Sequence, residues 1–208
     1  WLTSQGVDVH YCLVTSGDAG GDESTHTKEE RGAIREAEQT AAAAEVGVTD
    51  LTFLRYSDGT VEPNLQLRKD ISRVIRHVKP DLVITQNPDR NWDRVAASHP
   101  DHRAVGEATL NAVYPDARNP HAFPELLDEG FAAHKVPTVW ISVAPFSMVI
   151  DITEHFDRKM AALRCHVSQV GHIEDLETRI RDWGTLNATN AGMPEGHLAE
   201  GFREMNTQ

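Results

Sequence analysis

Short apolar runs rich in β-branched residues alternate along this chain with longer stretches in which apolar residues recur at helical spacing. The short runs predict strands at 7–15, 51–55, 81–86, 138–144 and 147–152. The helical spacing predicts helices over 27–47, 64–80, 100–114 and 155–169. Strands that alternate with helices indicate an α/β fold, in which a mostly parallel sheet is covered by helices on both faces.

The first predicted helix has the clearest boundaries. Thr27 and Glu30 form a Thr-x-x-Glu capping box, and Gly47 stands where a C-terminal cap belongs. The second helix ends at Pro80. No repeat, low-complexity segment or linker interrupts the sequence, so we expect one domain over 1–208.

Composition narrows the class of protein. A hydrophobic content of 39% with 25% charged residues is ordinary for a globular chain of 208 residues. The formal net charge of −12 argues against nucleic acid or an anionic membrane as a partner, because both select basic surfaces. No apolar run approaches the roughly 18 residues of a membrane-spanning helix. Two cysteines, Cys12 and Cys165, make no disulfide framework, so a reducing cytoplasm is the expected location.

Three polar loops follow the predicted strands, at 15–23, 56–60 and 86–102. In a parallel α/β sheet, the loops that leave the carboxyl ends of the strands gather at one edge, where ligands bind. Folding does not require so many Asp, Asn, Arg and Gly residues, so we expect the functional site in these loops.

The third loop ends in the motif HPDH, residues 99–102. A purely structural interpretation accounts for part of it: Pro100 suits the first turn of a helix, and Ser98 with Asp101 resembles a capping arrangement. This interpretation does not account for the two histidines that bracket the Pro-Asp pair. Neutral imidazole is a common zinc ligand and an acidic neighbour can orient it, so the motif is a candidate metal and catalytic site.

Trp92 and Arg90 lie shortly before this motif. Each is compatible with a solvated loop. An indole near His99 also suits the wall of a sugar site, where an aromatic face meets apolar C–H groups. We therefore include both residues as candidate substrate-binding residues.

Together these motifs resemble the PIG-L/LmbE-like family of zinc-dependent sugar N-deacetylases, which includes the deacetylase of mycothiol biosynthesis and mycothiol-conjugate amidases. HPDH is similar to the family's second signature. Further similarities lie in the same order along the chain: LVTSGDAGG, Arg35-x-x-Glu38-x-x-x-Ala42 ending at Gly47, SDG at 57–59, VYPDARNPHAFPEL, KMAALRCHVSQ and the terminal AEGFRE. The resemblance spans nearly the whole chain and implies a Rossmann-like fold.

The resemblance also implies roles for individual residues. His102 would ligate zinc, and a protonated His99 would stabilise the oxyanion formed during amide hydrolysis. Asp101 would orient and charge-balance His99, while Arg35 and Asp58 match positions that contact the sugar. The implied activity removes an acetyl group from an N-acetylated amino sugar or sugar conjugate. Zinc would polarise the amide carbonyl and lower the pKa of its bound water to about 7.

One family signature, HPDD, does not occur in residues 1–208. In the family it supplies two further zinc ligands, a His and an Asp, together with the general-base Asp. His10 is no substitute, because its place in an apolar run predicts burial in the sheet. We expect the first strand of the sheet, the remaining metal ligands and the general base upstream of Trp1.

Alternatives stay open at this point. A catalytically inactive member of the family would bind a sugar without metal, and the sequence upstream of Trp1 would discriminate between the two. A thiol conjugate could be cleaved instead of an acetamide, and neither the acetylated substrate nor a homo-oligomeric state follows from the sequence. A nucleotide-binding domain is disfavoured, because neither Gly-x-Gly-x-x-Gly nor Gly-x-x-x-x-Gly-Lys-Ser/Thr occurs.

Overall fold

The computed structural model describes residues 1–21 and 25–208, so residues 22 and 23 of the predicted 15–23 loop lie outside the described part. The chain divides into two compact units, residues 1–58 with 148–201 and residues 59–147 with 202–208. The expectation of one domain over 1–208 stays a prediction. Among the described residues, no helix is both long enough and apolar enough to cross a membrane.

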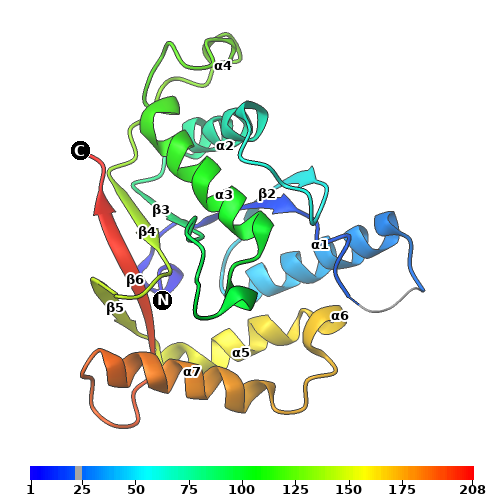
Figure 1. Ribbon diagram of the computed structural model, residues 1–208, viewed down its shortest axis with the longest axis vertical. Coiled ribbons are helices and arrows are strands. Elements are labelled where there is room, and N and C mark those ends of the chain that lie inside the picture. The colour runs from blue at the N-terminus through cyan, green and yellow to red at the C-terminus, as the bar shows by residue number, and fades with distance from the viewer. Residues whose placement is uncertain (22–24) are drawn as a thin grey trace. The chain divides into compact units, whose positions relative to one another are not determined.

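The first unit begins with a β-α-β arrangement, preceded by a 3-10 turn at Thr3–Gln5. Strands β1 (His10–Thr15) and β2 (Asp50–Tyr56) pair in parallel, and helix α1 (Lys28–Glu45) connects them (Figure 1). The predicted capping box is confirmed, because Thr27 and Glu30 each accept a hydrogen bond from the other's backbone N–H. The parallel pairing and the crossover helix agree with the predicted α/β fold.

β1 is less buried than its apolar sequence predicts. Val14 is the buried residue of the strand, and Cys12 is exposed. Within the described part of the chain β1 pairs with β2 alone, and a two-stranded sheet leaves much of its side-chain surface accessible. His10 is accordingly half-buried instead of buried, with its Nε2 2.9 Å from Thr52 Oγ1.

Helices α5 (Phe156–Arg164) and α7 (Leu176–Asn190) contribute to an apolar cluster of the first unit. Phe156 and Met160 on α5 are buried there, and Leu176 and Ile180 on α7 pack against them. The elements of this part of the chain are β5 (Met148–Asp151), a 3-10 turn (Thr153–His155), α5 (Phe156–Arg164), α6 (Val167–Val170) and α7 (Leu176–Asn190).

Two of these helices differ from the prediction. The helix predicted over 155–169 is divided into α5 and α6, because His166 between them has non-helical angles of φ −82° and ψ 55°. α7 was not predicted at all. Only some of its large apolar residues face the core, since Trp183 and Leu186 are exposed while the small Ala188 is buried.

The second unit contains a second parallel pair of strands. β3 (Leu82–Thr85) and β4 (Thr138–Ile141) run in parallel. The end of β6 (Ala199–Asn206) pairs antiparallel with β4, and the sequence did not predict this strand. β5 lies beside β6, which starts in the first unit. The elements are α2 (Leu65–Val78), β3 (Leu82–Thr85), a 3-10 turn (Val95–Ala97), α3 (Pro100–Asn111), a π-helical turn (Ala112–Asp116), α4 (Glu125–Asp128), β4 (Thr138–Ile141) and β6 (Ala199–Asn206).

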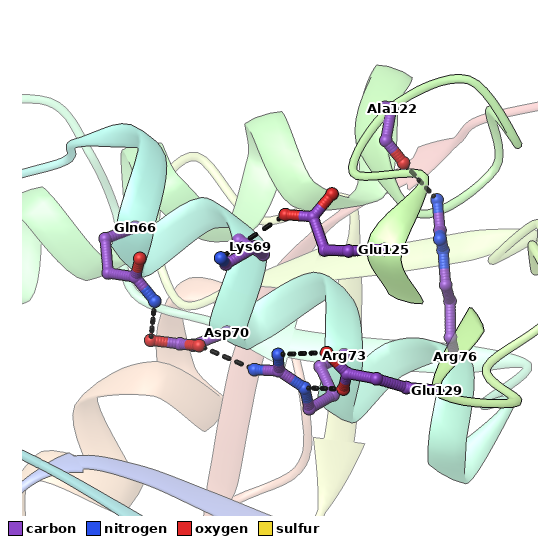
Figure 2. Close-up of polar contacts among 8 residues, drawn as sticks. All are labelled: Gln66, Lys69, Asp70, Arg73, Arg76, Ala122, Glu125 and Glu129. Atoms are coloured by element: carbon purple, nitrogen blue, oxygen red, sulfur yellow. Dashed lines mark hydrogen bonds and ion pairs between the residues drawn. The ribbon is translucent and has the colours of Figure 1, made fainter. Parts of the chain in front are cut away.

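Charged side chains fasten α2 to the segment around α4, as Figure 2 shows. Arg73 bridges Asp70 on its own helix, at 2.7 Å, and Glu129, at 2.8 Å. Lys69 pairs with Glu125 at 3.3 Å. These ion pairs are partly exposed, so each contributes little to stability.

Arg76 makes the stronger link, because its side chain is buried. Its Nη2 donates to the carbonyl oxygens of Asp116, Asn119 and Ala122, each at 2.9 Å, and the bond to Ala122 is drawn in Figure 2. Nε donates to Ala117 O at 3.1 Å. Burial lowers the pKa of this guanidinium, and the carbonyl oxygens stabilise the charge in place of water.

Gly106 lies where α3 passes the residues that follow β3. A Cβ built on Gly106 would lie 2.4 Å from Gln86 O and 3.0 Å from Pro88 N, both backbone atoms. The helix therefore approaches this backbone more closely than a side chain would allow. This close contact positions the third polar loop against the helix that begins with HPDH.

We predict that Gly106→Ala lowers the free energy of unfolding by roughly 1–3 kcal/mol, because the new methyl group overlaps backbone that must shift. By helix propensity alone, the change from glycine to alanine would raise the free energy of unfolding by about 1 kcal/mol. A decrease therefore indicates that the steric overlap is the larger effect. Gly32→Ala in α1 is the matched control. Its Cβ would lie 3.5 Å from Ser16 Cβ, an ordinary contact, and stability should hold or rise. Urea unfolding measures both, and an unchanged midpoint for Gly106→Ala would contradict the prediction.

Candidate functional site

Helix α3 begins at the HPDH motif. Pro100 occupies the first turn, as predicted, and His99 is the N-cap residue. His99 Nδ1 accepts a hydrogen bond from Asp101 N–H at 3.2 Å. In the neutral ring the proton is then on Nε2, which is the donor that His99 offers to a ligand.

Ser98 does not cap the helix, contrary to the prediction. Its buried Oγ instead accepts from Asn91 N–H at 2.7 Å. Asn91 Oδ1 accepts in turn from the N–H groups of Asp93 and Arg94. Ser98 therefore closes the base of the third loop. A four-residue pattern could not reveal this role, because the donor lies seven residues upstream.

The two imidazoles of the motif are exposed. The ring centroids of His99 and His102 lie 5.2 Å apart, with an angle of 47° between the planes. The residues between them have structural roles: Pro100 lies in the first turn of α3, and the Asp101 carboxylate binds backbone N–H groups. The motif thus has a structural middle and two exposed histidines at its ends, and the chemical role of these histidines stays a prediction.

Asp101 is the buried member of the motif, with 4% of its surface exposed. Its Oδ2 accepts from Gly59 N–H at 2.7 Å and its Oδ1 from Val61 N–H at 3.2 Å. The negative charge also lies at the positive end of α3. The side chain of Asp101 thereby holds the backbone that follows β2. The backbone N–H of Asp101 holds the His99 ring.

Trp92 and Arg90 extend into solvent from the third loop. Trp92 is 82% exposed, and the Arg90 guanidinium lies 5.7 Å from its ring centroid. The start of the loop is held by Arg103 Nε, which donates to Pro88 O at 3.1 Å. The indole is accessible to a ligand, and the substrate-binding role of both residues stays a prediction.

Arg35, on α1 in the first unit, reaches the first polar loop. Its Nη1 and Nη2 donate to the carbonyl oxygens of Gly17 and Gly20. A Cβ on Gly17 or Gly20 would lie 2.7 or 2.8 Å from Arg35 Nη1, so the glycines let the guanidinium approach the loop backbone. The observed contacts of Arg35 are therefore within the protein, and its predicted contact with a sugar stays a prediction.

Asp58, in the turn after β2, is joined to the Asp18–Ala19 segment of the first loop by two hydrogen bonds. Asp18 Oδ1 accepts from Asp58 N–H at 3.0 Å, and Asp58 Oδ2 accepts from Ala19 N–H at 3.1 Å. We call this reciprocal arrangement the Asp18–Asp58 bracket. From the sequence, Asp18 is compatible with an ordinary turn residue or with a residue that shapes the floor of the site, and it was not assigned a role.

β2 contains an extra residue shortly before Asp58. Leu13 pairs with Phe53, whereas Thr15 pairs with Tyr56, so the register shifts by one residue. Arg55 lies in this bulge with φ of +57°, a left-handed conformation that costs a non-glycine residue about 1–2 kcal/mol. No feature of the sequence predicted the bulge.

Glu36 on α1 binds the side chain of Arg55. Arg55 Nε and Nη2 each donate to its carboxylate at 2.9 Å, and Ser16 Oγ donates at 2.5 Å. The Arg55 guanidinium keeps the pKa of Glu36 below its usual value. Glu36 therefore ties the end of β2 to the start of the first loop.

A second acidic residue on α1, Glu38, has a structural role that connects two of the sequence similarities, Arg35-x-x-Glu38 and KMAALRCHVSQ. Glu38 accepts from Ser168 N–H at 2.6 Å and from Ser168 Oγ at 2.7 Å. The Arg-x-x-Glu pattern and the His-x-Ser-Gln pattern thus meet where α1 contacts α6. The hydrogen bonds of this pair link α1 to α6.

Within residues 1–21 and 25–208, no group of three or more His, Cys, Asp or Glu side chains could hold a metal ion. A zinc site normally has three protein ligands. His102 supplies an accessible imidazole, but the Asp101 carboxylate is committed to backbone N–H groups. The described donors therefore fit part of a zinc site and not a complete one.

Comparison with known proteins defines the class and the family. The solved N,N′-diacetylchitobiose deacetylase from Pyrococcus horikoshii, complexed with its inhibitor MPG, matches with a TM-score of 0.88 and 27% identity, over 99% of this chain and 75% of that chain. This is an α/β protein with a deacetylase-type fold. The chain belongs to the PIG-L family, described as GlcNAc-PI de-N-acetylase, which matches residues 1–113.

Two relatives extend the comparison. A diacetylchitobiose deacetylase from Thermococcus kodakarensis is 31% identical, over 97% of this chain and 74% of the relative. A probable N-acetyl-alpha-D-glucosaminyl L-malate deacetylase 2 from Bacillus anthracis is 29% identical, over 80% of this chain and 71% of the relative. The similarity extends across both compact units.

We predict that Asp101→Asn lowers the free energy of unfolding by about 1–3 kcal/mol. An amide has one acceptor oxygen, so its NH₂ group would face one of the two N–H groups that the carboxylate now binds. Asp93→Asn, an exposed change in the same loop, is the control and should be neutral. Equal urea midpoints for the two variants would contradict the structural role given to Asp101.

Proposed function

We propose that this chain belongs to an enzyme that hydrolyses the acetamide of an N-acetylated amino sugar or sugar conjugate. The observation that carries the proposal is the division of the HPDH motif into a structural Pro-Asp pair and two exposed imidazoles. Membership of the PIG-L family and relatives named as sugar deacetylases support the same reaction. Water adds to the acetamide carbonyl, the C–N bond breaks, and acetate and the free amine leave.

His99 is the proposed oxyanion donor. Its Nδ1 is held by Asp101 N–H, so the ring is oriented before substrate arrives and presents Nε2–H. A preorganised donor stabilises charge that develops on the carbonyl oxygen without a cost of reorientation. Asp101 acts through His99 and the backbone after β2, and is therefore a positioning residue.

His102 is the proposed zinc ligand in residues 1–208. Zinc, when bound, would polarise the acetamide carbonyl and lower the pKa of a water molecule. Since the described residues supply only part of a site, the remaining ligands and the general base are proposed to lie N-terminal to Trp1. The exposed His102 ring on the first turn of α3 supports its part in this ligand set.

Arg35, Asp58, Trp92 and Arg90 are the proposed sugar-binding residues. Arg35 and Asp58 take this role from their positions in the family pattern. The exposed indole of Trp92 suits the apolar C–H face of a pyranose, and the nearby Arg90 guanidinium adds donors for hydroxyl groups.

We predict that His102→Ala in the complete polypeptide abolishes stoichiometric zinc while circular dichroism stays unchanged, because an exposed ligand is lost and no core contact is. His121→Ala, also exposed in the same unit, is the matched control and should retain zinc. Elemental analysis measures the metal. Unchanged zinc in His102→Ala would overturn the ligand assignment.

We predict that His99→Ala retains zinc but lowers kcat for acetate release from N,N′-diacetylchitobiose by roughly 10²–10³-fold, as expected for the loss of one oxyanion donor. His99→Asn separates catalysis from capping, because asparagine caps helices well but does not place an Nε2–H. Both variants should lose activity. Recovery in His99→Asn would show that only the cap matters, and a wild-type protein that binds the sugar without releasing acetate would favour an inactive sugar-binding member.

A further inference from the structure

In the Asp18–Asp58 bracket, Asp18 is placed to orient Asp58, one of the proposed sugar-binding residues. Two loops that follow neighbouring parallel strands each place a carboxylate on a backbone N–H of the other. Asp18 holds the N–H of Asp58 itself, so it fixes the backbone from which the Asp58 side chain extends. We propose that Asp18 is a positioning residue for substrate affinity and acts through Asp58, an inference that rests on the proposed function.

The loop that carries Asp18 is itself held in place. Arg35 donates to the carbonyl oxygens on either side of Asp18, those of Gly17 and Gly20. Gly17 has φ of +65°, and Gly20 N–H donates to Gly17 O at 3.3 Å, so the loop is a tight turn. The Asp18 carboxylate is thus presented from a turn whose backbone is bound on both sides.

The partner loop is constrained at the same point. Before Asp58, the bulge at Arg55 is held by two bonds to Glu36. The Asp58 carboxylate uses Oδ2 to accept from Ala19 N–H. In the proposed binding mode its Oδ1 accepts a sugar hydroxyl, and the direction of that oxygen depends on both halves of the bracket.

The Asp58 carboxylate therefore takes part both in the Asp18–Asp58 bracket and in the proposed binding of the sugar. A free aspartate side chain would have to give up rotamer freedom when it binds a hydroxyl, whereas Asp58 is already ordered. Without Asp18, the Asp58 backbone should be less ordered. Binding of the sugar would then have to order Asp58, and the affinity should fall. The loss should appear in KM, because the bracket contributes to binding equally in the ground state and the transition state.

The test is steady-state kinetics of acetate release from N,N′-diacetylchitobiose with the complete polypeptide. Asp18→Ala should raise KM about tenfold, the size expected for one lost charge-assisted hydrogen bond, and leave kcat within about twofold. Asp18→Asn keeps an acceptor oxygen for Asp58 N–H and should restore most of the affinity. Asp8→Ala, an exposed residue ahead of β1 with the same charge change, is the matched control and should leave KM unchanged.

A double-mutant cycle shows whether Asp18 acts through Asp58. In the Asp58→Ala background, Asp18→Ala should have no further effect on KM. Additive effects would overturn the proposal, because they would mean that Asp18 contributes independently. An unchanged KM for Asp18→Ala, with a raised KM for Asp58→Ala, would also overturn it while leaving the proposed function intact.

Amide hydrogen exchange gives a readout that does not depend on activity. Asp18→Ala should speed exchange at the Asp58 N–H, and Asp58→Ala should speed exchange at the Ala19 N–H. Unchanged exchange in both variants would show that the bracket does not form. If the bracket forms but the wild-type enzyme releases no acetate from the probe, the proposed function fails, and the positioning role of Asp18 fails with it.

Discussion

The carboxylate of Asp101 is the contact on which the candidate catalytic end of the second unit depends. Both of its oxygens accept backbone N–H groups, from Gly59 and Val61, and its own N–H holds the His99 ring. A buried charge is tolerated only when such partners replace water, so the residue and the backbone around it constrain one another. The orientation of His99 is a consequence of this arrangement, and the two imidazoles remain accessible because the fold needs neither of them as a buried group.

The first unit uses the same physical device. Asp18 and Asp58 accept backbone N–H groups, while Arg35 donates to backbone carbonyls. Loops of this kind have few apolar side chains to bury, so hydrogen bonds from charged groups hold their shape. This explains why the polar residues that drew attention in the sequence divide into two sets: some bind backbone, and others, such as Trp92, remain exposed.

Much of the fold was predictable from local patterns, and the differences have identifiable causes. The capping box at Thr27 was predicted, because both partners lie within one helical turn. Ser98 was assigned to the wrong partner, since its actual donor, Asn91, lies across a loop. Helix α7 and strand β6 were missed because their buried faces are made of small residues, such as Ala188 and Ala199, and their larger apolar residues are partly or largely exposed.

By itself the sequence determined the alternation of strands and helices, the start of α3 at Pro100 and the HPDH motif with its family resemblance. These features depend on side-chain periodicity and on hydrogen bonds within a few residues, which a linear pattern records. The tertiary structure alone decided which polar residues bind backbone. The partners of Asp101 at Gly59 and of Asp18 at Asp58 are 42 and 40 residues apart, and folding brings them within hydrogen-bond distance. Hydrogen bonds need donor and acceptor to approach within about 3 Å at a favourable angle, a condition that depends on the packed backbone and that no residue pattern specifies.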